Sequence, residues 1–259
     1  MPKRNYRQKT TGKQVKGVTT LLSILSKPAL IFWGFKQGMS NFERLMEELA
    51  SLKATRLESD SIAGYYFPDY EVQDLIQDFK ATGLYDKRDK AADAGTLAHL
   101  FVENHLRGLP DPSREGILSD VVSKAEGCYM TFLDWEKSNS IKVLDSEVEL
   151  TSEFYPFGGT IDHVIQGALT QNGKVDILDI KTGKDIYLEA KIQVKAYGVL
   201  WNEHHVESDG LVSGYHILRL GESGEFTHKY FPSLDEGYFK IFLDCMDINQ
   251  RLEALGEKL

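Results

Sequence analysis

The chain has 259 residues, of which 42% are hydrophobic and 27% charged, as is ordinary for a soluble globular protein. This length suits one large domain or a core with an added lobe. No stretch approaches the roughly 18 consecutive apolar residues of a membrane helix, and the N-terminus lacks the apolar core of a secretion signal. We therefore exclude membrane-spanning and exported classes and expect a cytoplasmic protein without a membrane partner.

The net charge of −9 argues against a nucleic-acid partner, but its distribution reverses that argument. Residues 1–42 contain eight Lys or Arg and no acidic residue, whereas the remainder holds 22 basic and 39 acidic residues, a net −17. A basic arm on an acidic body can bind a phosphate backbone locally. A solvated terminus without a partner explains the pattern equally well. The candidate DNA-binding residues are Lys3, Arg4, Arg7, Lys9, Lys13 and Lys16.

The N-terminal third is predicted to be an arm followed by short helices. Residues 2–17 are polar and indicate an extended arm or a hairpin, and an apolar helical run follows at 21–25. Pro28 suits the first turn of a second helix, and Ser40 with Glu43 forms a capping box for a third. Residues 53–88 mix charges with aromatic side chains that could stack on unpaired bases as a lid or arch. We favour the alternative, an aromatic loop folded onto the surface.

Helical and alternating patterns then predict an α/β core with a mixed central sheet flanked by helices, a restriction-endonuclease-like arrangement. We divide the chain into residues 1–89, the basic arm and helical lobe, and residues 90–259, the core. The predicted core elements are helices 90–107 and 113–137, strands 141–150, 157–167 and 174–181, a helix from Asp185 to about Glu203, strands 211–220 and 225–231, and a helix opened by a capping box of Ser233 and Glu236.

Two charged residues stand at the end of the strand predicted at 175–181. The period of two places Asp179 and Lys181 on one face with Val175 and Ile177, while Leu178 and Ile180 occupy the other face. Apolar residues on both faces indicate a strand buried between layers. Burying a carboxylate and an ammonium there is costly unless the site uses them.

A divalent metal would give this arrangement a purpose. Asp162, in the Gly-Gly-Thr-Ile-Asp-His sequence at 158–163, and Asp179 would supply the carboxylate oxygens that Mg²⁺ and Mn²⁺ prefer. Lys181 could orient or deprotonate the attacking water, or offset charge on a phosphate. Gln193 and Tyr197 lie four residues apart on the next predicted helix and hence on one face.

In this order of motifs the chain resembles the PD-(D/E)xK nuclease superfamily, in its RecB-like branch. That branch includes nuclease domains of bacterial recombination helicases, CRISPR-associated RecB-like exonucleases, the mitochondrial genome maintenance exonuclease and many phage proteins. The resemblance covers roughly residues 90–200. It implies cleavage of DNA phosphodiester bonds with Mg²⁺ or Mn²⁺.

The resemblance also implies roles for single residues. It makes His99 a metal ligand together with Asp162, Asp179 and the backbone carbonyl of Ile180, and it makes Gln193 and Tyr197 a pair that orients Lys181 and the phosphate. Glu103, one turn after His99, would hydrogen-bond His99 and fix its tautomer, or would be a surface acid. An acidic residue one strand before Asp162 is expected to act as well, and Glu147 is preferred over Glu149 on spacing.

Some relatives hold an iron–sulfur cluster through four cysteines, but this chain has two, Cys128 and Cys245. We interpret both as small core residues and expect no cluster. The favoured function is exonucleolytic cleavage of single-stranded DNA or DNA ends in replication, recombination or repair, with a protein partner from these processes. A bacterial or phage-infected cell is the expected setting. A structure-selective endonuclease, a non-catalytic DNA-binding or recombination module and an unrelated metal-dependent hydrolase remain as alternatives.

Overall fold

The computed structural model describes residues 4–25, 84–166, 174–205 and 210–257, together with Arg44 and Glu47. The chain divides into two compact units, one of Met1–Leu25 with Ala94–Leu259 and one of Ser26–Asp93. The basic N-terminal segment thus groups with the predicted core. We had placed this segment with the helical lobe, in a domain that ends at residue 89. The predictions for Pro28, for the Ser40 capping box and for an aromatic lid at 53–83 lie outside the described residues.

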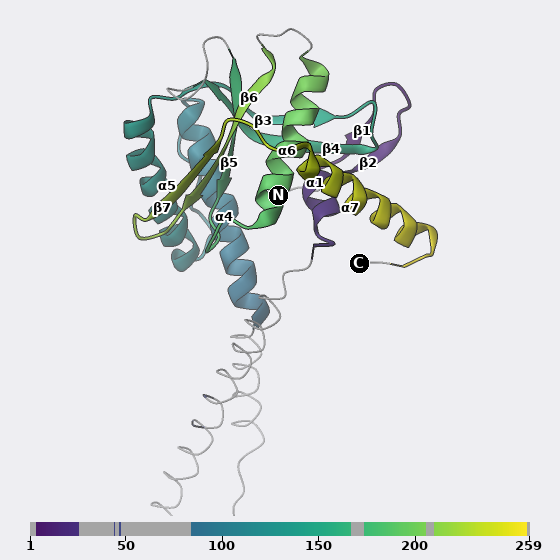
Figure 1. Cartoon of the computed structure of the whole chain (residues 1–259). Coiled ribbons are helices and arrows are strands. Elements are labelled where there is room, and N and C mark those ends of the chain that lie inside the picture. The colour runs from purple at the N-terminus through teal and green to yellow at the C-terminus, as the bar shows by residue number, and fades with distance from the viewer. Residues whose placement is uncertain are drawn as a thin grey trace, which may run out of the picture. The chain divides into compact units, whose positions relative to one another are not determined.

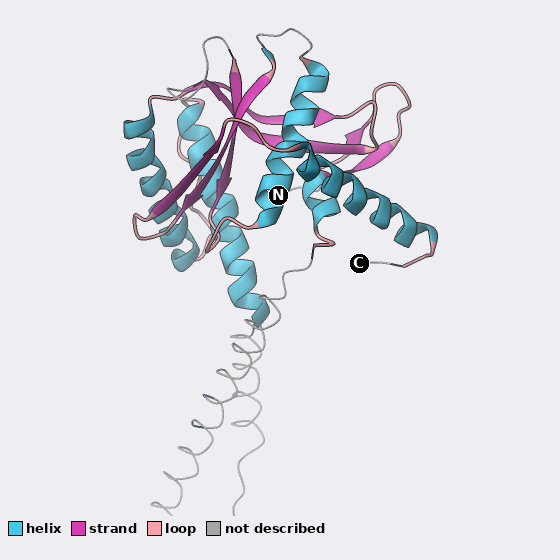
Figure 2. Cartoon of the chain, viewed as in Figure 1, coloured by secondary structure: helices cyan, strands magenta, loops and turns pink. Residues whose placement is uncertain are grey.

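The described strands form one mixed sheet, which confirms the predicted fold class (Figure 2). The order is β1-β2-β4-β5-β6-β7, with β3 paired to β4. The pairs β2–β4 and β5–β6 are parallel, and the remaining pairs are antiparallel. The strands are β1 (Tyr6–Arg7), β2 (Gln14–Gly17), β3 (Lys142–Thr151), β4 (Phe157–Gln166), β5 (Val175–Lys181), β6 (Val212–Leu220) and β7 (Phe226–Phe231).

Helices cover both faces of this sheet (Figure 1). One apolar cluster joins the sheet to α4 and α5, and the other joins it to α1, α6 and α7. The helices are α1 (Val18–Leu22), α4 (Leu84–Leu106), α5 (Ser119–Asn139), α6 (Leu188–His204) and α7 (Glu236–Ala254). None of the helices in the described ranges is long and apolar enough to cross a membrane.

The alternation predicted for β5 is confirmed by these two clusters. Ile177 packs in the cluster with α6, whereas Leu178 and Ile180 pack in the cluster with α4 and α5. All three side chains are fully buried. β5 is therefore covered on both faces, and a charged side chain near its end is enclosed by the fold.

Two helix starts differ from the prediction. The side chain of Asp185 accepts a hydrogen bond from the N–H of Ile186, and α6 begins later because Tyr187 is still extended. At α7 the cap is Asp235, whose carboxylate accepts a hydrogen bond from the N–H of Gly237 at 2.6 Å. A carboxylate directly before the first turn reaches its free N–H groups, so the more distant Ser233 is not the cap.

The N-terminal arm is a hairpin docked onto the sheet. β1 pairs with β2, and β2 pairs with the start of β4. The ring of Tyr6 lies against Gly158, where an added Cβ would come within 2.6 Å of it. The hydroxyl of Tyr6 lies 3.0 Å from Oγ1 of Thr160, which stands within β4 and not in a turn. The hairpin therefore packs beside the residues that precede Asp162.

Candidate active site

Neighbouring strands bring the two predicted carboxylates together. β4 and β5 are antiparallel, with His163 opposite Leu178. The next opposed positions are therefore Asp162, just before His163, and Asp179, just after Leu178. The backbone N–H of Ile180 donates to Oδ2 of Asp162 at 2.9 Å. Burial raises the pKa of Asp162 to about 6, although the charge of Lys181 opposes this shift.

Asp179 is a fully buried carboxylate. Nζ of Lys181 lies 2.6 Å from its Oδ2, close enough for an ion pair, but neither carboxylate oxygen accepts a well-aligned hydrogen bond from a described residue. Burial raises the pKa of Asp179 to about 6, against the opposing effect of Lys181. Burial alone would lower the pKa of Lys181, but the charges of Asp179 and Asp162 outweigh it and raise that pKa.

His99 reaches this pair of strands from α4. Its Nδ1 lies 3.6 Å from Oδ2 of Asp162, which is longer than a hydrogen bond. Burial, and then the charge of Lys181, lower the pKa of His99 to about 4. The imidazole is therefore neutral at pH 7 and keeps a lone pair that can bind a metal.

Glu103 has a different partner from the expected one. His99 and Glu103 lie four residues apart on α4, and Arg107 follows four residues later, directly after the helix ends. Oε1 of Glu103 lies 2.6 Å from Nη1 of Arg107. The carboxylate thus pairs with the cation one turn further on, instead of holding His99. Such a charge pair is favoured over a hydrogen bond to a neutral imidazole.

Gln193 and Tyr197 face the carboxylates from α6. Nε2 of Gln193 donates to the hydroxyl of Tyr197 at 2.8 Å. Burial, and then the charges of Asp162 and Asp179, raise the pKa of Tyr197 well above 10. An added Cβ at Gly159 would come within 2.7 Å of the Tyr197 ring, so the close approach of α6 to β4 requires glycine there.

Glu147 and Glu149 are separated by the structure. Glu149 is exposed, whereas the Glu147 side chain is 15% exposed and pairs with the guanidinium of Arg4. The charge of Glu147 contributes to raising the pKa of Asp162, and the charge of Arg4 contributes to lowering it. The pairing of Glu147 with Arg4, which lies 143 residues earlier, was not predicted. The available signal was the alternation of Arg4, Tyr6 and Gln8 within the basic arm.

The remaining basic residues of the hairpin have other surroundings. Nζ of Lys16 lies 2.8 Å from Oε1 of Glu253 on α7, and Arg7 donates to the carbonyl of Gly12. Lys9 and Lys13 are exposed, and Lys3 lies outside the described residues. Of the predicted DNA-binding residues described here, Arg4 is the one held against the candidate site.

Three other residues have structural surroundings. His163 is buried and its Nδ1 lies 2.9 Å from the hydroxyl of Ser146, in agreement with its omission from the site. Cys128 and Cys245 are buried free thiols in different apolar clusters, as expected of core residues.

The donor set suits a hard divalent cation, although it does not form a closed cage. Within the described ranges no three His, Cys, Asp or Glu side chains are grouped closely enough to hold an ion by themselves. Asp162, His99 and the fully buried carboxylate of Asp179 offer the oxygen and nitrogen donors that Mg²⁺ and Mn²⁺ accept. Mg²⁺ commonly takes one or two carboxylates and completes its shell with water and phosphate oxygens. The residues therefore fit such an ion.

Comparison with known proteins adds little to this geometry. No family model matches the chain, and no curated protein matches it. Among solved structures the chain is similar to a crystal structure from Eubacterium rectale of a protein provisionally assigned as an exonuclease. The identity is 14% and the TM-score 0.39, over 61% of this chain and 65% of that chain, which is less than two thirds of its length. The function is therefore inferred from the site itself.

Proposed function

We propose that this protein is a metal-dependent deoxyribonuclease of the RecB-like PD-(D/E)xK type. The observation that carries the proposal is the carboxylate of Asp179, fully buried without a well-aligned hydrogen bond and placed between Asp162 and Lys181. Such a group destabilises a fold unless the site uses it. Two carboxylates, a neutral imidazole and an ammonium suit phosphoryl chemistry better than a purely structural role.

His99, Asp162, Asp179 and the carbonyl of Ile180 would hold the metal. When bound, Mg²⁺ or Mn²⁺ supplies Lewis-acid polarisation of the phosphate and a water of lowered pKa. The protein's part is to present donors of fixed geometry. Because the N–H of Ile180 holds Oδ2 of Asp162, the Asp162 carboxylate is fixed before substrate arrives.

Lys181 acts as a donor and not as a base in this proposal. Its raised pKa keeps the ammonium protonated at neutral pH. It can therefore orient the attacking water or balance the negative charge that grows on the phosphate. The raised pKa of Tyr197 likewise keeps its hydroxyl protonated, and Gln193 fixes that hydroxyl beside the carboxylates.

The proposed substrate is single-stranded DNA or a DNA end, cut exonucleolytically during replication, recombination or repair. The support is Arg4 of the docked hairpin, which places one cation beside Glu147 at the level of Asp162. A partner protein from the same process is proposed on the resemblance alone.

The test compares Lys181→Ala with wild type on a labelled single-stranded oligonucleotide in Mg²⁺. We expect cleavage to fall by at least about 10³-fold, as for loss of a main electrostatic group, with DNA binding kept within about threefold. Lys137→Ala removes an exposed lysine that also has an aspartate partner, Asp134, and should leave cleavage unchanged. Equal cleavage by Lys181→Ala and wild type would overturn the proposal.

A further inference from the structure

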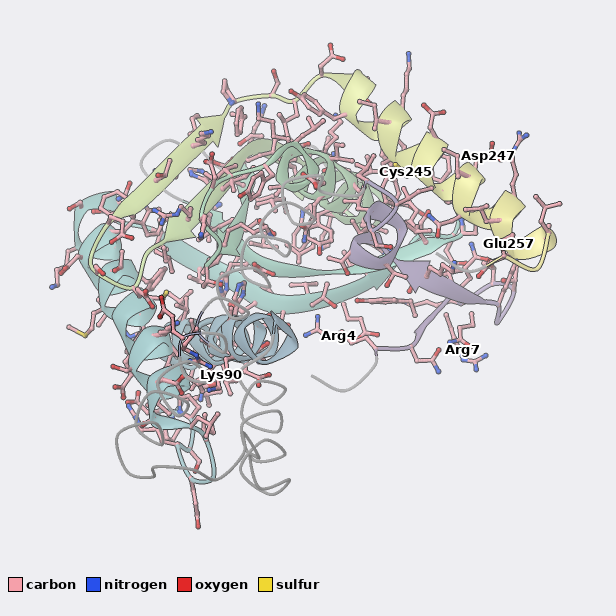
Figure 3. All side chains as sticks on the ribbon, turned by 90° about the horizontal axis from the view of Figure 1, so that it is seen from below. Arg4, Arg7, Lys90, Cys245, Asp247 and Glu257 are labelled. Atoms are coloured by element: carbon pink, nitrogen blue, oxygen red, sulfur yellow. The ribbon has the colours of Figure 1, made fainter. Side chains whose placement is uncertain are left out.

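The N-terminal hairpin carries one cation directly to the candidate site. Nη2 of Arg4 pairs with Oε2 of Glu147, and the two side chains are 33% and 15% exposed. Burial lowers the pKa of Arg4, but the hydrogen bond and charge of Glu147, with a smaller contribution from Tyr6, raise it overall. Figure 3 shows Arg4 and Arg7 at separate places along the hairpin, with Arg7 nearer its turn.

Arg4 lies two residues before β1, and the hairpin is anchored directly after it by contacts to β4 and to the turn that precedes β4. Tyr6 is buried on Gly158 and Thr160, and Nε2 of Gln8 donates to the carbonyl of Ser152 at 3.0 Å. Because Tyr6 and Gln8 are buried in these contacts, the chain two residues before β1 is kept close to the sheet, where Arg4 pairs with Glu147. The position of Arg4 is therefore imposed by packing and not by its charge alone.

Glu147 has an unusual backbone for a residue within a strand. Its φ is +54°, in the left-handed region that costs a non-glycine residue about 1–2 kcal/mol. The register of β3 on β4 pairs Ser146 with His163 and Val148 with Ile161, so Glu147 stands level with Asp162. The strained residue thus holds Arg4 beside a carboxylate of the site. Backbone strain of this kind is common where a side chain must be aimed.

We propose that Arg4 binds a phosphate of the DNA substrate next to the scissile bond and that Glu147 is a positioning residue that aims it. This inference rests on the proposed function. A guanidinium has five N–H donors in a rigid fork, so one edge can remain on Glu147 while another donates to a phosphate. Asp162 and Asp179 repel a phosphate, and Arg4 and Lys181 offset that repulsion from two sides.

The first experiment measures binding of a fluorescent single-stranded oligonucleotide by anisotropy in EDTA, where no cleavage occurs. Arg4→Ala should weaken binding about tenfold and reduce the slope of log affinity against log salt by about 0.7, the loss of one phosphate contact. Arg4→Lys should recover part of the affinity. Arg251→Ala removes an exposed arginine that also has an aspartate partner, Asp247, and should change neither quantity. An equal loss in Arg251→Ala, or an unchanged slope in Arg4→Ala, would overturn the role of Arg4.

The second experiment is a double-mutant cycle of Arg4→Ala and Glu147→Gln, measured as kcat and KM on the same oligonucleotide in Mn²⁺. If Glu147 acts through Arg4, Glu147→Gln raises KM in the wild-type background and has no further effect in Arg4→Ala. The Mn²⁺ concentration for half-maximal rate should stay within twofold. Additive losses, or a large rise in the Mn²⁺ requirement, would instead make Glu147 a direct participant and refute its positioning role.

The two proposals fail in different ways. If wild type binds the oligonucleotide with the predicted Arg4 dependence but never cleaves it, the nuclease proposal fails and the phosphate contact stands. If wild type cleaves and Arg4→Ala binds and cleaves normally, the phosphate contact fails alone. Thermal unfolding of each variant within about 3 °C of wild type ensures that binding is compared between folded proteins.

Discussion

Nζ of Lys181 lies 2.6 Å from Oδ2 of Asp179, two residues earlier on the same strand. The pair shares one face of β5, yet Lys181 remains partly exposed whereas Asp179 is fully buried. The ion pair therefore joins a fully buried carboxylate to an ammonium at the partly exposed end of β5. An isolated salt bridge buried in this way adds little stability, because desolvation offsets the attraction. We therefore attribute the pair to the proposed nuclease reaction and not to stabilisation of the fold.

Asp179→Asn is expected to stabilise the metal-free protein while abolishing cleavage. The pKa of Asp179 is about 6 in the folded protein, compared with an ordinary value of 3.8. This difference means that the fold disfavours the charged carboxylate by roughly 3 kcal/mol. A group whose pKa is higher in the folded than in the unfolded protein stabilises the fold when the pH is below its unfolded pKa. For Asp179 this stabilisation is lost as the pH rises from about 4 to about 6. The free energy of unfolding in EDTA should therefore fall over that window in wild type and fall less in the variant.

The same measurement has a matched control. Asp134→Asn changes an exposed aspartate with a lysine partner and should shift stability by less than about 0.5 kcal/mol. At pH 7 we expect Asp179→Asn to be more stable than wild type by about 1–3 kcal/mol. If Asp179→Asn were less stable than wild type at pH 7, the surrounding residues would stabilise the charged Asp179 carboxylate, and the prediction would be wrong.

Metal binding should be visible without any cleavage. An ion that binds only the folded protein raises the free energy of unfolding by about 2.7 kcal/mol at 100 times its Kd. We therefore expect Mn²⁺ to raise the Tm of wild type, and His99→Ala and Asp179→Asn to reduce or remove this rise. His105→Ala changes another histidine of α4, which pairs with Glu136, and serves as the control. An equal Mn²⁺ effect in wild type and Asp179→Asn would contradict the assigned ligands.

Gly159→Ala tests the approach of α6 to β4. The new methyl group would lie 2.7 Å from the Tyr197 ring, and such overpacking costs about 1–3 kcal/mol. Because Tyr197 faces both carboxylates, cleavage should fall as well. Gly183→Ala is the control, since no described atom lies within 4 Å of its added Cβ. Chemical denaturation of both variants measures the difference, and equal stability would mean that Tyr197 is free to move.

A buried polar network lies on the face of β5 opposite to Asp179 and Lys181. Oδ2 of Asp176 is 3.0 Å from Nε2 of His216, whose Nδ1 lies 2.8 Å from Nε2 of His228, and Ser213 donates to Oδ1 of Asp176. Asp176→Ala should destabilise the protein by about 3 kcal/mol, because it leaves buried partners unsatisfied. Cleavage per folded molecule should stay unchanged, since the network faces α5. A loss of kcat in the folded variant would connect it to the site.

Local patterns in the sequence predict the sheet well. Alternation along Val175–Lys181 and the spacing of Gln193 and Tyr197 depend on periods of two and four that any strand or helix must obey. The structure places Asp162 and Asp179 at opposed positions of β4 and β5. His99, a candidate from the resemblance and not from these periods, lies 3.6 Å from Asp162.

Features that depend on competition between side chains are not predictable in this way. Glu103 forms its ion pair with Arg107, and Arg4 pairs with Glu147, which lies 143 residues later in the sequence. Lys16 lies beside Glu253 on α7, a pairing that the sequence does not predict. Each of these ion pairs depends on which charged side chains the fold brings within a few ångströms of one another. The sequence shows that the charges are present but not which of them become neighbours.

Digestion of end-labelled linear and circular single-stranded DNA, in Mg²⁺, Mn²⁺ or EDTA, by wild type and Asp179→Asn tests the proposed exonuclease activity itself. We predict progressive shortening of the linear strand with either metal, no cleavage in EDTA or by the variant, and intact circles. Cutting of circles with the same metal dependence would keep the nuclease and replace the exonuclease by an endonuclease. A folded wild-type protein that binds Mn²⁺ but leaves every DNA intact would contradict the account.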